Sequence, residues 1–333
     1  MKAFSRVVAI LFVTLTLATC RREATTPQTS SPTQPAKSLQ HVTLATSTNL
    51  WCALPLIAKD RGYFQEEGLD VAINIQDGGR YCMDALLGGS AQFANVVETN
   101  IAYLAFTGNK DVRVVANVVD STSMAVVAWK TSGIAKPEDL AGKRLAFTPA
   151  TQGEIFAARF LKKHGVPLDL KTVRKLPPKA IPAAIGAHEV DAASTWEPFV
   201  NAALKAMGND GIVFRDPDAH RGYMHVAVRD GWAQQNQQAV TAFIRALKKA
   251  DEFGRAHPDE AKTILAKQTK LDITTINAIW DYYNMHLTLD RPGLIAATTA
   301  VGQWIKESQP DYAPKPLPDY SPYYDDRYFR AAQ

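Results

Sequence analysis

Apolar positions along residues 41–229 follow two alternating spacings. Runs rich in β-branched residues, such as HVTLAT from His41 and LDVAINI from Leu69, are each followed by a segment whose apolar residues lie three or four positions apart, for example RYCMDALLGG from Arg80. The first kind of run predicts a strand and the second predicts a helix. Strands that alternate with helices in this way favour a largely parallel sheet with helices packed on its faces.

The alternation of strands and helices occurs in two series. The second series begins at KRLAFT from Lys143, and the chain becomes helical between residues 230 and 308. We therefore predict two doubly wound α/β lobes, joined where AVVAWK (125–130) and MHVAVR (224–229) carry the chain out to the second lobe and back. Two crossings form a hinge, and loops from both lobes then line a cleft. The predicted bounds are 41–128 with 228–333 for the first lobe and its C-terminal helices, and 129–227 for the second lobe.

The N-terminal segment has the pattern of an export signal. Lys2 and Arg6 flank the start of the apolar run 7–17, which is too short to span a bilayer permanently and has the length of a secretory signal. The sequence LATC, ending at Cys20, resembles the lipobox of bacterial lipoproteins, in which the cysteine is acylated and becomes the first residue. Thr19 departs from the small residue usual before that cysteine, so an ordinary signal peptide cut nearby remains the alternative.

A polar segment separates this signal from the α/β pattern. Residues 21–39 are rich in Ser, Thr, Pro and Gln, a composition that does not bury a core and predicts a flexible tether. We therefore expect a signal peptide over 1–19, lipidation of Cys20 and a disordered tether over 20–40. Such an anchor would hold the folded body at a membrane, on its periplasmic or extracellular face.

Composition narrows the class of protein. The chain has 333 residues, 46% of them hydrophobic, which is enough for one large domain or two modest ones and excludes a disordered or fibrous chain. Its formal net charge of +4 falls to +2 without residues 1–19, which hold two basic residues and no acid. No basic stripe interleaved with aromatic residues is present, so nothing predicts a nucleic-acid partner.

The sequence offers little support for catalysis or for a cofactor. No G-x-S-x-G elbow for a nucleophile occurs, and the seven histidines are scattered without the spacing of a metal site such as H-E-x-x-H. We therefore expect no enzyme activity, no cofactor and no metal. A purely adhesive lipoprotein is a further alternative, but it would have no need of a cleft lined by polar loops.

Four segments, taken in order, resemble a known family. They are LPLIAKDRGYFQEEGLDVAI from Leu54, DALLGGSAQFA from Asp84, GIAKPEDLAGKRLAF from Gly133 and VDAASTWEPFVNAA from Val190. Over residues 44–204 the chain resembles the substrate-binding proteins of ABC importers in the nitrate/sulfonate/taurine and thiamine-pyrimidine group. The resemblance implies a type II periplasmic binding protein fold and capture of a small solute between the lobes.

The resemblance also implies partners. The closed protein would deliver its solute to an ABC permease with its ATPase, and we expect it to act as a monomer. The expected solute is a small organic molecule, either sulfonate- or taurine-like or zwitterionic. A thiamine-precursor pyrimidine or another heterocycle is the alternative, and an enzyme on the same fold that uses Cys52 and Cys82 is a remote one.

The loop TPATQGE, from Thr148, joins a predicted strand to a long amphipathic helix. In relatives the matching loop supplies hydroxyl and backbone N–H groups to an anionic part of the ligand, and a helix N-terminus favours such a charge. By this resemblance Thr148, Thr151 and Gln152 are candidate ligand contacts. Thr151 also suits the N-cap of the following helix, and this structural role remains the alternative.

Two further loops place acids and an aromatic ring at the expected cleft. Trp196 and Glu197 follow a strand of the second lobe, where Trp196 can stack on a ligand or else pack beneath the hinge, and Glu197 can accept hydrogen bonds. Glu98 and Thr99 open a helix directly after a strand of the first lobe. A carboxylate there would repel a simple anion but suit a zwitterion or a heterocycle with N–H donors. The alternative is that Glu98 only caps its own helix.

Two cysteines remain once Cys20 is assigned to the lipid. Cys52 and Cys82 each lie near the start of a helix that follows a strand, and in the implied fold those strands are neighbours. We expect a Cys52–Cys82 disulfide, which an oxidising compartment permits. Two free thiols, or a thiolate site for a soft metal or a reactive ligand, are the alternatives. Neighbouring candidate ligand contacts at the cleft rim are Asn49, Trp51, Gly79, Arg80 and Tyr81.

Overall fold

The computed structural model describes residues 38–169 and 172–333. The predicted signal peptide, Cys20 and most of the predicted tether lie outside the described residues. Residues 38–333 form one compact unit by themselves. No helix in these described ranges is both long enough and apolar enough to cross a bilayer.

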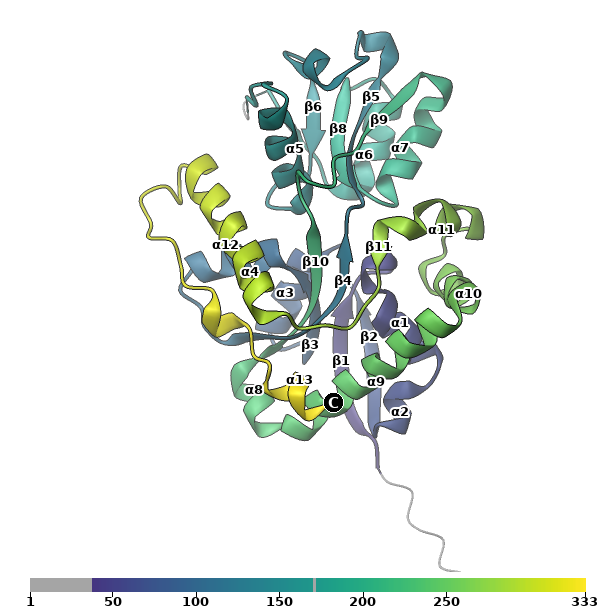
Figure 1. Cartoon of the computed structure of the whole chain (residues 1–333), viewed down its shortest axis with the longest axis vertical. Coiled ribbons are helices and arrows are strands. Elements are labelled where there is room, and N and C mark those ends of the chain that lie inside the picture. Colours follow the sequence, from purple (N-terminus) through teal and green to yellow (C-terminus); the bar gives the residue numbers. More distant parts are fainter. Residues whose placement is uncertain (1–37, 170–171) are drawn as a thin grey trace, which may run out of the picture. The chain divides into compact units, whose positions relative to one another are not determined.

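The first lobe is built on a six-stranded sheet (Figure 1). Strand β1 pairs in parallel with β2 and β3, whereas β10 runs antiparallel to its neighbours β3 and β4. Parallel strands in the centre require crossover helices, as the strand–helix alternation predicted. In spatial order the strands are β11 (Tyr283–Asn284), β4 (Val112–Ser121), β10 (Gly222–Arg229), β3 (Phe93–Val97), β1 (Gln40–Thr46) and β2 (Leu69–Ile75).

Helices cover both faces of this sheet. One face carries α3 (Gly79–Leu87), α4 (Glu98–Phe106) and α12 (Arg291–Ser308), which share an apolar cluster. The other face is covered chiefly by α9 (Gln237–Ala256), whose Phe243 stacks on Phe93 of β3 with ring centroids 4.0 Å apart. The remaining helices of the first lobe are α1 (Ala53–Asp60), α2 (Tyr63–Glu66), α8 (Asp230–Gln235), α10 (Pro258–Thr269), α11 (Ile273–Ile279) and α13 (Arg327–Ala331).

The second lobe is a smaller five-stranded sheet with helices on both faces. Strand β5 lies antiparallel between β8 and β9, and β6 lies parallel between β7 and β8. Helix α5 packs on one face, and α6 and α7 pack on the other (Figure 1). Their bounds are β5 (Met124–Trp129), β6 (Leu145–Phe147), α5 (Gln152–Lys163), β7 (Arg174–Lys175), α6 (Ile181–Gly186), β8 (Ala192–Trp196), α7 (Phe199–Met207) and β9 (Gly211–Phe214).

Two crossings join the lobes, as a hinge of two segments requires. The chain passes from β4 to β5 through residues 122–123 and returns from β9 to β10 through residues 215–221. Figure 1 shows β4 and β10 side by side as they rise toward the second lobe. Each crossing lies a few residues before the bound expected from the sequence, because the apolar runs at 125–130 and 224–229 are the strands that follow the crossings. The two-lobed α/β fold itself is confirmed.

Candidate functional site

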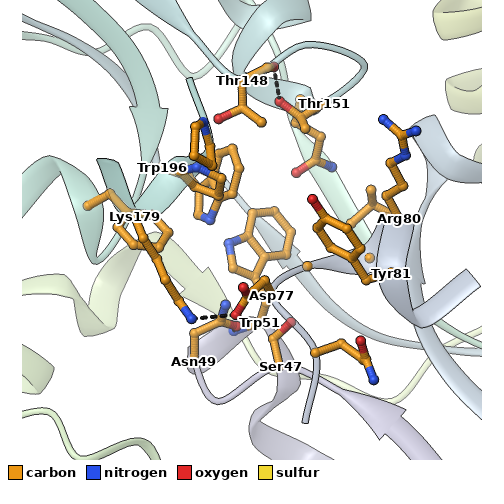
Figure 2. Close-up of a pocket in the computed structure, with 18 of the residues that line it drawn as sticks. Ser47, Asn49, Trp51, Asp77, Arg80, Tyr81, Thr148, Thr151, Lys179 and Trp196 are labelled. Carbon is orange, nitrogen blue, oxygen red and sulfur yellow. Dashed lines mark hydrogen bonds and ion pairs between the residues drawn. The ribbon is translucent and has the colours of Figure 1, made fainter. Parts of the chain in front are cut away.

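A cavity of about 520 Å³ lies between the two lobes (Figure 2). Its walls come from loops that follow strands of both sheets, which is where ligands bind in open α/β sheets. A volume in the range of roughly 300–1,000 Å³ suits a small organic ligand. Nine of the twelve predicted contact residues line this cavity, namely Asn49, Trp51, Gly79, Arg80, Tyr81, Thr148, Thr151, Gln152 and Trp196.

The wall from the first lobe begins in the loop after β1. The Asn49 side chain accepts a hydrogen bond from the Trp51 N–H at 3.2 Å and so caps a short 3-10 helix, Leu50–Cys52. Capping orients the loop, and it places the Trp51 ring edge-on to Tyr283 with centroids 5.8 Å apart. Trp51 is only 3% exposed, so its position is set by the core as well as by the cavity.

The start of helix α3 lies at the same wall. A Cβ atom at Gly79 would come within 2.4 Å of Asn100 Oδ1, so a larger residue there would displace the Asn100 side chain that lies between α3 and α4. The same Asn100 oxygen accepts a hydrogen bond from the Val97 N–H at 3.0 Å. These contacts hold Arg80 and Tyr81 at the cavity, where Tyr81 remains 50% exposed.

The wall from the second lobe contains the loop before α5. Thr151 accepts a hydrogen bond from the Gly153 N–H at 3.2 Å and donates one to the Thr148 carbonyl at 2.7 Å. Thr151 is therefore an N-cap, the alternative role expected for it, although it also lines the cavity. The buried hydroxyl of Thr148 has no hydrogen-bond partner among the described residues. A ligand that accepts or donates a hydrogen bond there would satisfy it.

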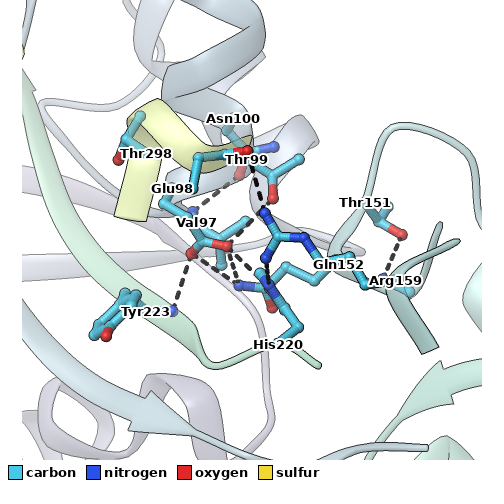
Figure 3. A network of polar contacts seen from close by, with 12 residues as sticks. Val97, Glu98, Thr99, Asn100, Thr151, Gln152, Arg159, His220, Tyr223 and Thr298 are labelled. Atoms are coloured by element: carbon cyan, nitrogen blue, oxygen red, sulfur yellow. Dashed lines mark hydrogen bonds and ion pairs between the residues drawn. The ribbon is translucent and has the colours of Figure 1, made fainter. Parts of the chain in front are cut away.

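Glu98 does not line the cavity, contrary to the role expected for it. Its side chain is 1% exposed, and its two oxygens accept hydrogen bonds from the Gln152 amide at 2.8 and 2.9 Å and from the Tyr223 N–H at 2.9 Å. His220 Nε2 lies 3.2 Å from the same carboxylate. Thr99 is also buried, with its hydroxyl 3.4 Å from Glu98. Figure 3 shows this network, which joins α4, α5 and the second crossing.

Arg159 of α5 sets the tautomer of His220. Its guanidinium Nη1 donates to His220 Nδ1 at 3.2 Å, and because arginine is only a donor, that nitrogen carries no hydrogen. The hydrogen is then on Nε2, which faces Glu98. Burial alone raises the pKa of Glu98, but His220 and the hydrogen bonds just described outweigh it and hold the pKa below its ordinary value. Glu98 is thus an ionised structural group between the lobes.

Glu197 is likewise engaged by the protein. Its carboxylate pairs with Arg215 of the second crossing and accepts a hydrogen bond from the Asn201 N–H at 3.0 Å. The Tyr283 hydroxyl donates to the Glu197 carbonyl at 2.9 Å. Glu197 is 2% exposed and does not line the cavity, so the carboxylate expected to meet a ligand instead ties the second lobe to the hinge.

The sequence did not predict several of the residues that line the cavity. Asp77 follows β2, and its carboxylate pairs with Lys179 of the second lobe (Figure 2). Lys175 belongs to β7, a strand of only two residues, which is too short to give a periodic signal. The position of Asp77 directly before Gly78-Gly79 was the available clue for that acid. Other lining residues not predicted include Ser47, Ile75, Asn100, Leu176, Phe199 and Met224.

The predicted disulfide is not formed in the structure. Cys52 and Cys82 are free and buried, and Cys82 lies near enough to Cys52 for the two thiols to interact electrostatically. Burial raises the pKa of the Cys52 thiol to about 11 and also raises that of Cys82, so both are protonated at neutral pH. Within residues 38–169 and 172–333 no group of three His, Cys, Asp or Glu side chains is placed to hold a metal ion.

Comparison with known proteins agrees with the resemblance found in the sequence. The family described as NMT1/THI5 like matches residues 52–261 of the chain. The taurine-binding periplasmic protein of Escherichia coli (strain K12) is 31% identical over 211 residues, which are 60% of this chain and 62% of that protein.

Solved structures share the fold. The periplasmic aliphatic sulphonate binding protein SsuA of Escherichia coli matches with a TM-score of 0.74 and 17% identity, covering 86% of this chain and 97% of that one. The alkanesulfonate-binding protein SsuA of Xanthomonas axonopodis pv. citri, bound to MOPS, matches with a TM-score of 0.72 and 18% identity, covering 87% and 99%. At these identities the likeness shows the periplasmic binding protein fold.

Proposed function

The chain belongs to the NMT1/THI5-like family, and on that premise we propose that it is a lipid-anchored solute-binding protein that captures a sulfonate-type organic anion in the cleft. It then delivers the solute to an ABC permease. Family and fold support the coarser part, an exported binding protein of ABC import. The anchor at Cys20 rests on the lipobox alone, and the class of solute rests on the charge of the cavity.

The charged residues that line the cavity favour an anion. Three are cations, Arg80, Lys175 and Lys179, and one is a carboxylate, Asp77. Asp77 is already paired with Lys179, so Arg80 and Lys175 are left without a hydrogen bond or ion pair in the described part of the chain. The first turns of α3 and α5 add backbone N–H groups at the same cavity. Lys175 also interacts electrostatically with the buried Glu154, but Glu154 does not line the cavity. The excess of positive charge on the lining itself is the observation that carries the proposal.

A zwitterion is a poorer match than a simple anion. Its ammonium group would need an unpaired carboxylate; the sequence suggested Glu98 for that purpose and Glu197 as an acceptor of hydrogen bonds. Both are buried and engaged with the protein's own donors. The cavity therefore supports a sulfonate without an amino group over a taurine-like solute.

Planar heterocycles are the second candidate. Four aromatic side chains line the cavity, and their faces suit a flat ring. A pyrimidine presenting N–H donors would also have needed Glu98, which is engaged elsewhere. The aromatic lining is thus the one observation that favours this candidate.

Binding is expected to close the hinge. A solute that contacts both walls makes its full set of interactions only in the closed form, so it shifts the population toward that form. The permease would then recognise the closed protein. Nothing in this cycle requires catalysis.

A thermal-shift screen with simple sulfonates, taurine and pyrimidines tests the proposal, because a ligand that binds only the folded protein raises the unfolding midpoint. A hit should also reduce the radius of gyration in small-angle scattering. Lys175→Gln should weaken sulfonate binding about tenfold. Lys162→Gln is the control and should leave binding unchanged, because Lys162 is an exposed residue of α5 that does not line the cavity and has no ion-pair partner among residues 38–169 and 172–333. Sulfonate binding that is indifferent to both variants would refute the assigned site.

A further inference from the structure

The cavity has aromatic walls on both of its sides. Trp51 and Tyr81 come from the first lobe, and Trp196 and Phe199 come from the second. Figure 2 shows the rings of Trp51, Tyr81 and Trp196 around the same space. Closure of the hinge would bring rings of the two lobes toward each other across whatever occupies the cavity.

Part of this aromatic surface is not used by the core. Tyr81 is 50% exposed, and Trp196 and Phe199 are partly exposed, packed against each other edge to face with centroids 5.8 Å apart. Ile75, 51% exposed, lines the same cavity. Exposed apolar side chains that gather in one concave site are typical of a ligand site rather than of ordinary surface.

The size of the cavity also argues against a very small solute. A two-carbon sulfonate would fill only part of about 520 Å³ and would leave most of the aromatic surface in contact with water. A six-membered ring attached to the anionic group would contact the aromatic side chains while the anion stayed near Arg80, Lys175 and the free Thr148 hydroxyl. Offset-stacked and edge-to-face ring pairs then add attraction that a saturated ring does not have.

A cavity with aromatic walls, or aromatic cage, also suits organic ammonium ions, but the charge of this site excludes them. Organic ammonium ions bind to such cages through the negative faces of the rings. Here the charged lining is positive, and Asp77, the only carboxylate among the described lining residues, is paired with Lys179. A cation would therefore meet repulsion without a counter-charge.

We propose that the cleft selects an anion carried on a planar aromatic ring, such as an aryl sulfonate or an aromatic carboxylate, over aliphatic sulfonates and taurine. Trp196 and Tyr81 are the specificity-determining residues, one from each lobe. The inference rests on the proposed solute-binding function and narrows its substrate class. The ligand is defined by its flat ring and its negative charge, and the experiment below distinguishes a sulfonate from a carboxylate as the anionic group.

Titration calorimetry on the purified chain, with tryptophan fluorescence as a second readout, tests the inference. The probes are benzenesulfonate, benzoate, cyclohexanesulfonate, ethanesulfonate, taurine and benzylammonium. We expect benzenesulfonate or benzoate to bind at least about tenfold more tightly than cyclohexanesulfonate, which has a similar size and the same charge as benzenesulfonate but no aromatic ring. The stronger of the two aromatic probes identifies the preferred anionic group.

Variants separate ring recognition from folding. Trp196→Leu should weaken the better aromatic probe about tenfold and leave cyclohexanesulfonate within about twofold. Tyr81→Leu should act in the same direction, and because Tyr81 is half exposed its loss leaves the core intact. Trp304→Leu, a partly exposed tryptophan of α12 outside the cavity, is the matched control and should change neither affinity.

The outcomes distinguish this inference from the function on which it rests. Equal or tighter binding of cyclohexanesulfonate or ethanesulfonate would overturn ring selection while supporting an anion-binding protein. Equal or tighter binding of taurine, a zwitterion, would overturn both ring selection and the preference for an anion without an amino group. Preferred binding of benzylammonium, or binding of none of the six probes, would overturn both. Unchanged selectivity in Trp196→Leu and Tyr81→Leu would overturn the assignment of these residues.

Discussion

Replacement of the buried Glu98 by glutamine tests whether this carboxylate holds the lobes together. The substitution preserves shape but turns one carboxylate oxygen into an NH₂ group. If that group replaces Oε1, it faces His220 Nε2 and the Gln152 amide; if it replaces Oε2, it faces the Tyr223 N–H and the same amide. Either orientation sets donors against donors and removes a buried negative charge from its partners.

The expected magnitude follows from these contacts. A hydrogen bond to a charged group contributes about 1.5–3 kcal/mol, and two such contacts are lost or inverted in Glu98→Gln. Allowing for relaxation, we expect the free energy of unfolding at pH 7 to fall by about 3 kcal/mol. At roughly 2 °C per kcal/mol for a large domain, the unfolding midpoint should fall by about 6 °C.

Calorimetric and urea unfolding at pH 7 measure this effect. Glu252→Gln is the matched control, because Glu252 is an exposed residue of α9 with no partner in the described part of the chain. Its unfolding midpoint should stay within about 1 °C of the wild type. An equally small change for Glu98→Gln would refute the view that the Glu98 network stabilises the junction of the lobes.

The Glu98 network also predicts a response to acid. The pKa of Glu98 is lower in the folded protein than in the unfolded chain, so its contribution is fully present above the unfolded value of about 4.3 and is lost as pH falls through the folded pKa. Wild-type unfolding curves should therefore lose stability more steeply below about pH 4 than those of Glu98→Gln. Parallel curves in this range would contradict the pKa shift.

Two further predictions concern other buried titratable groups. Burial lowers the pKa of His225 to about 4, from an unfolded value of about 6.5, so the unfolded chain takes up the proton first as the pH falls. The free energy of unfolding should therefore fall by at most about 3 kcal/mol between about pH 6.5 and pH 4. His225→Gln should flatten this slope in calorimetric scans, and an unchanged slope would contradict the assignment. In a Cys20→Ser chain, which leaves only Cys52 and Cys82, both thiols should resist an aromatic disulfide reagent in the native protein and react with it after denaturation. If two thiols do not titrate in the unreduced, denatured chain, the two cysteines form a disulfide.

Local patterns in the sequence predicted the fold well, because they reflect local physics. The period of apolar residues specifies strands and helices, and a strand–helix alternation leaves few ways to cover a parallel sheet on both faces. The same reasoning placed loops at the strand ends, so residues of those loops, among them Trp51 and Trp196, were expected at a cleft and do line the cavity. Contact of these residues with a ligand remains a prediction.

The roles of the two acids depended on partners that are distant along the chain. Glu98 opens α4 as expected, but its partners Gln152 and Tyr223 come from the second lobe and from β10. Glu197 meets Arg215 of the second crossing in a similar way. A local pattern identifies a charged residue after a strand; it does not show which distant donor reaches that residue first.

The sequence by itself determined the two α/β series and the loops from which a binding cleft is built, since each of these depends on short-range composition and periodicity; the export signal stays a prediction. Only the tertiary structure decided which side chains face the cavity. It placed Asp77 and Lys179 in contact across the cleft, brought Lys175 to the wall from a two-residue strand, and left Cys52 and Cys82 as buried free thiols. The physical reason is that pairing and burial depend on distances between segments, which no local pattern contains.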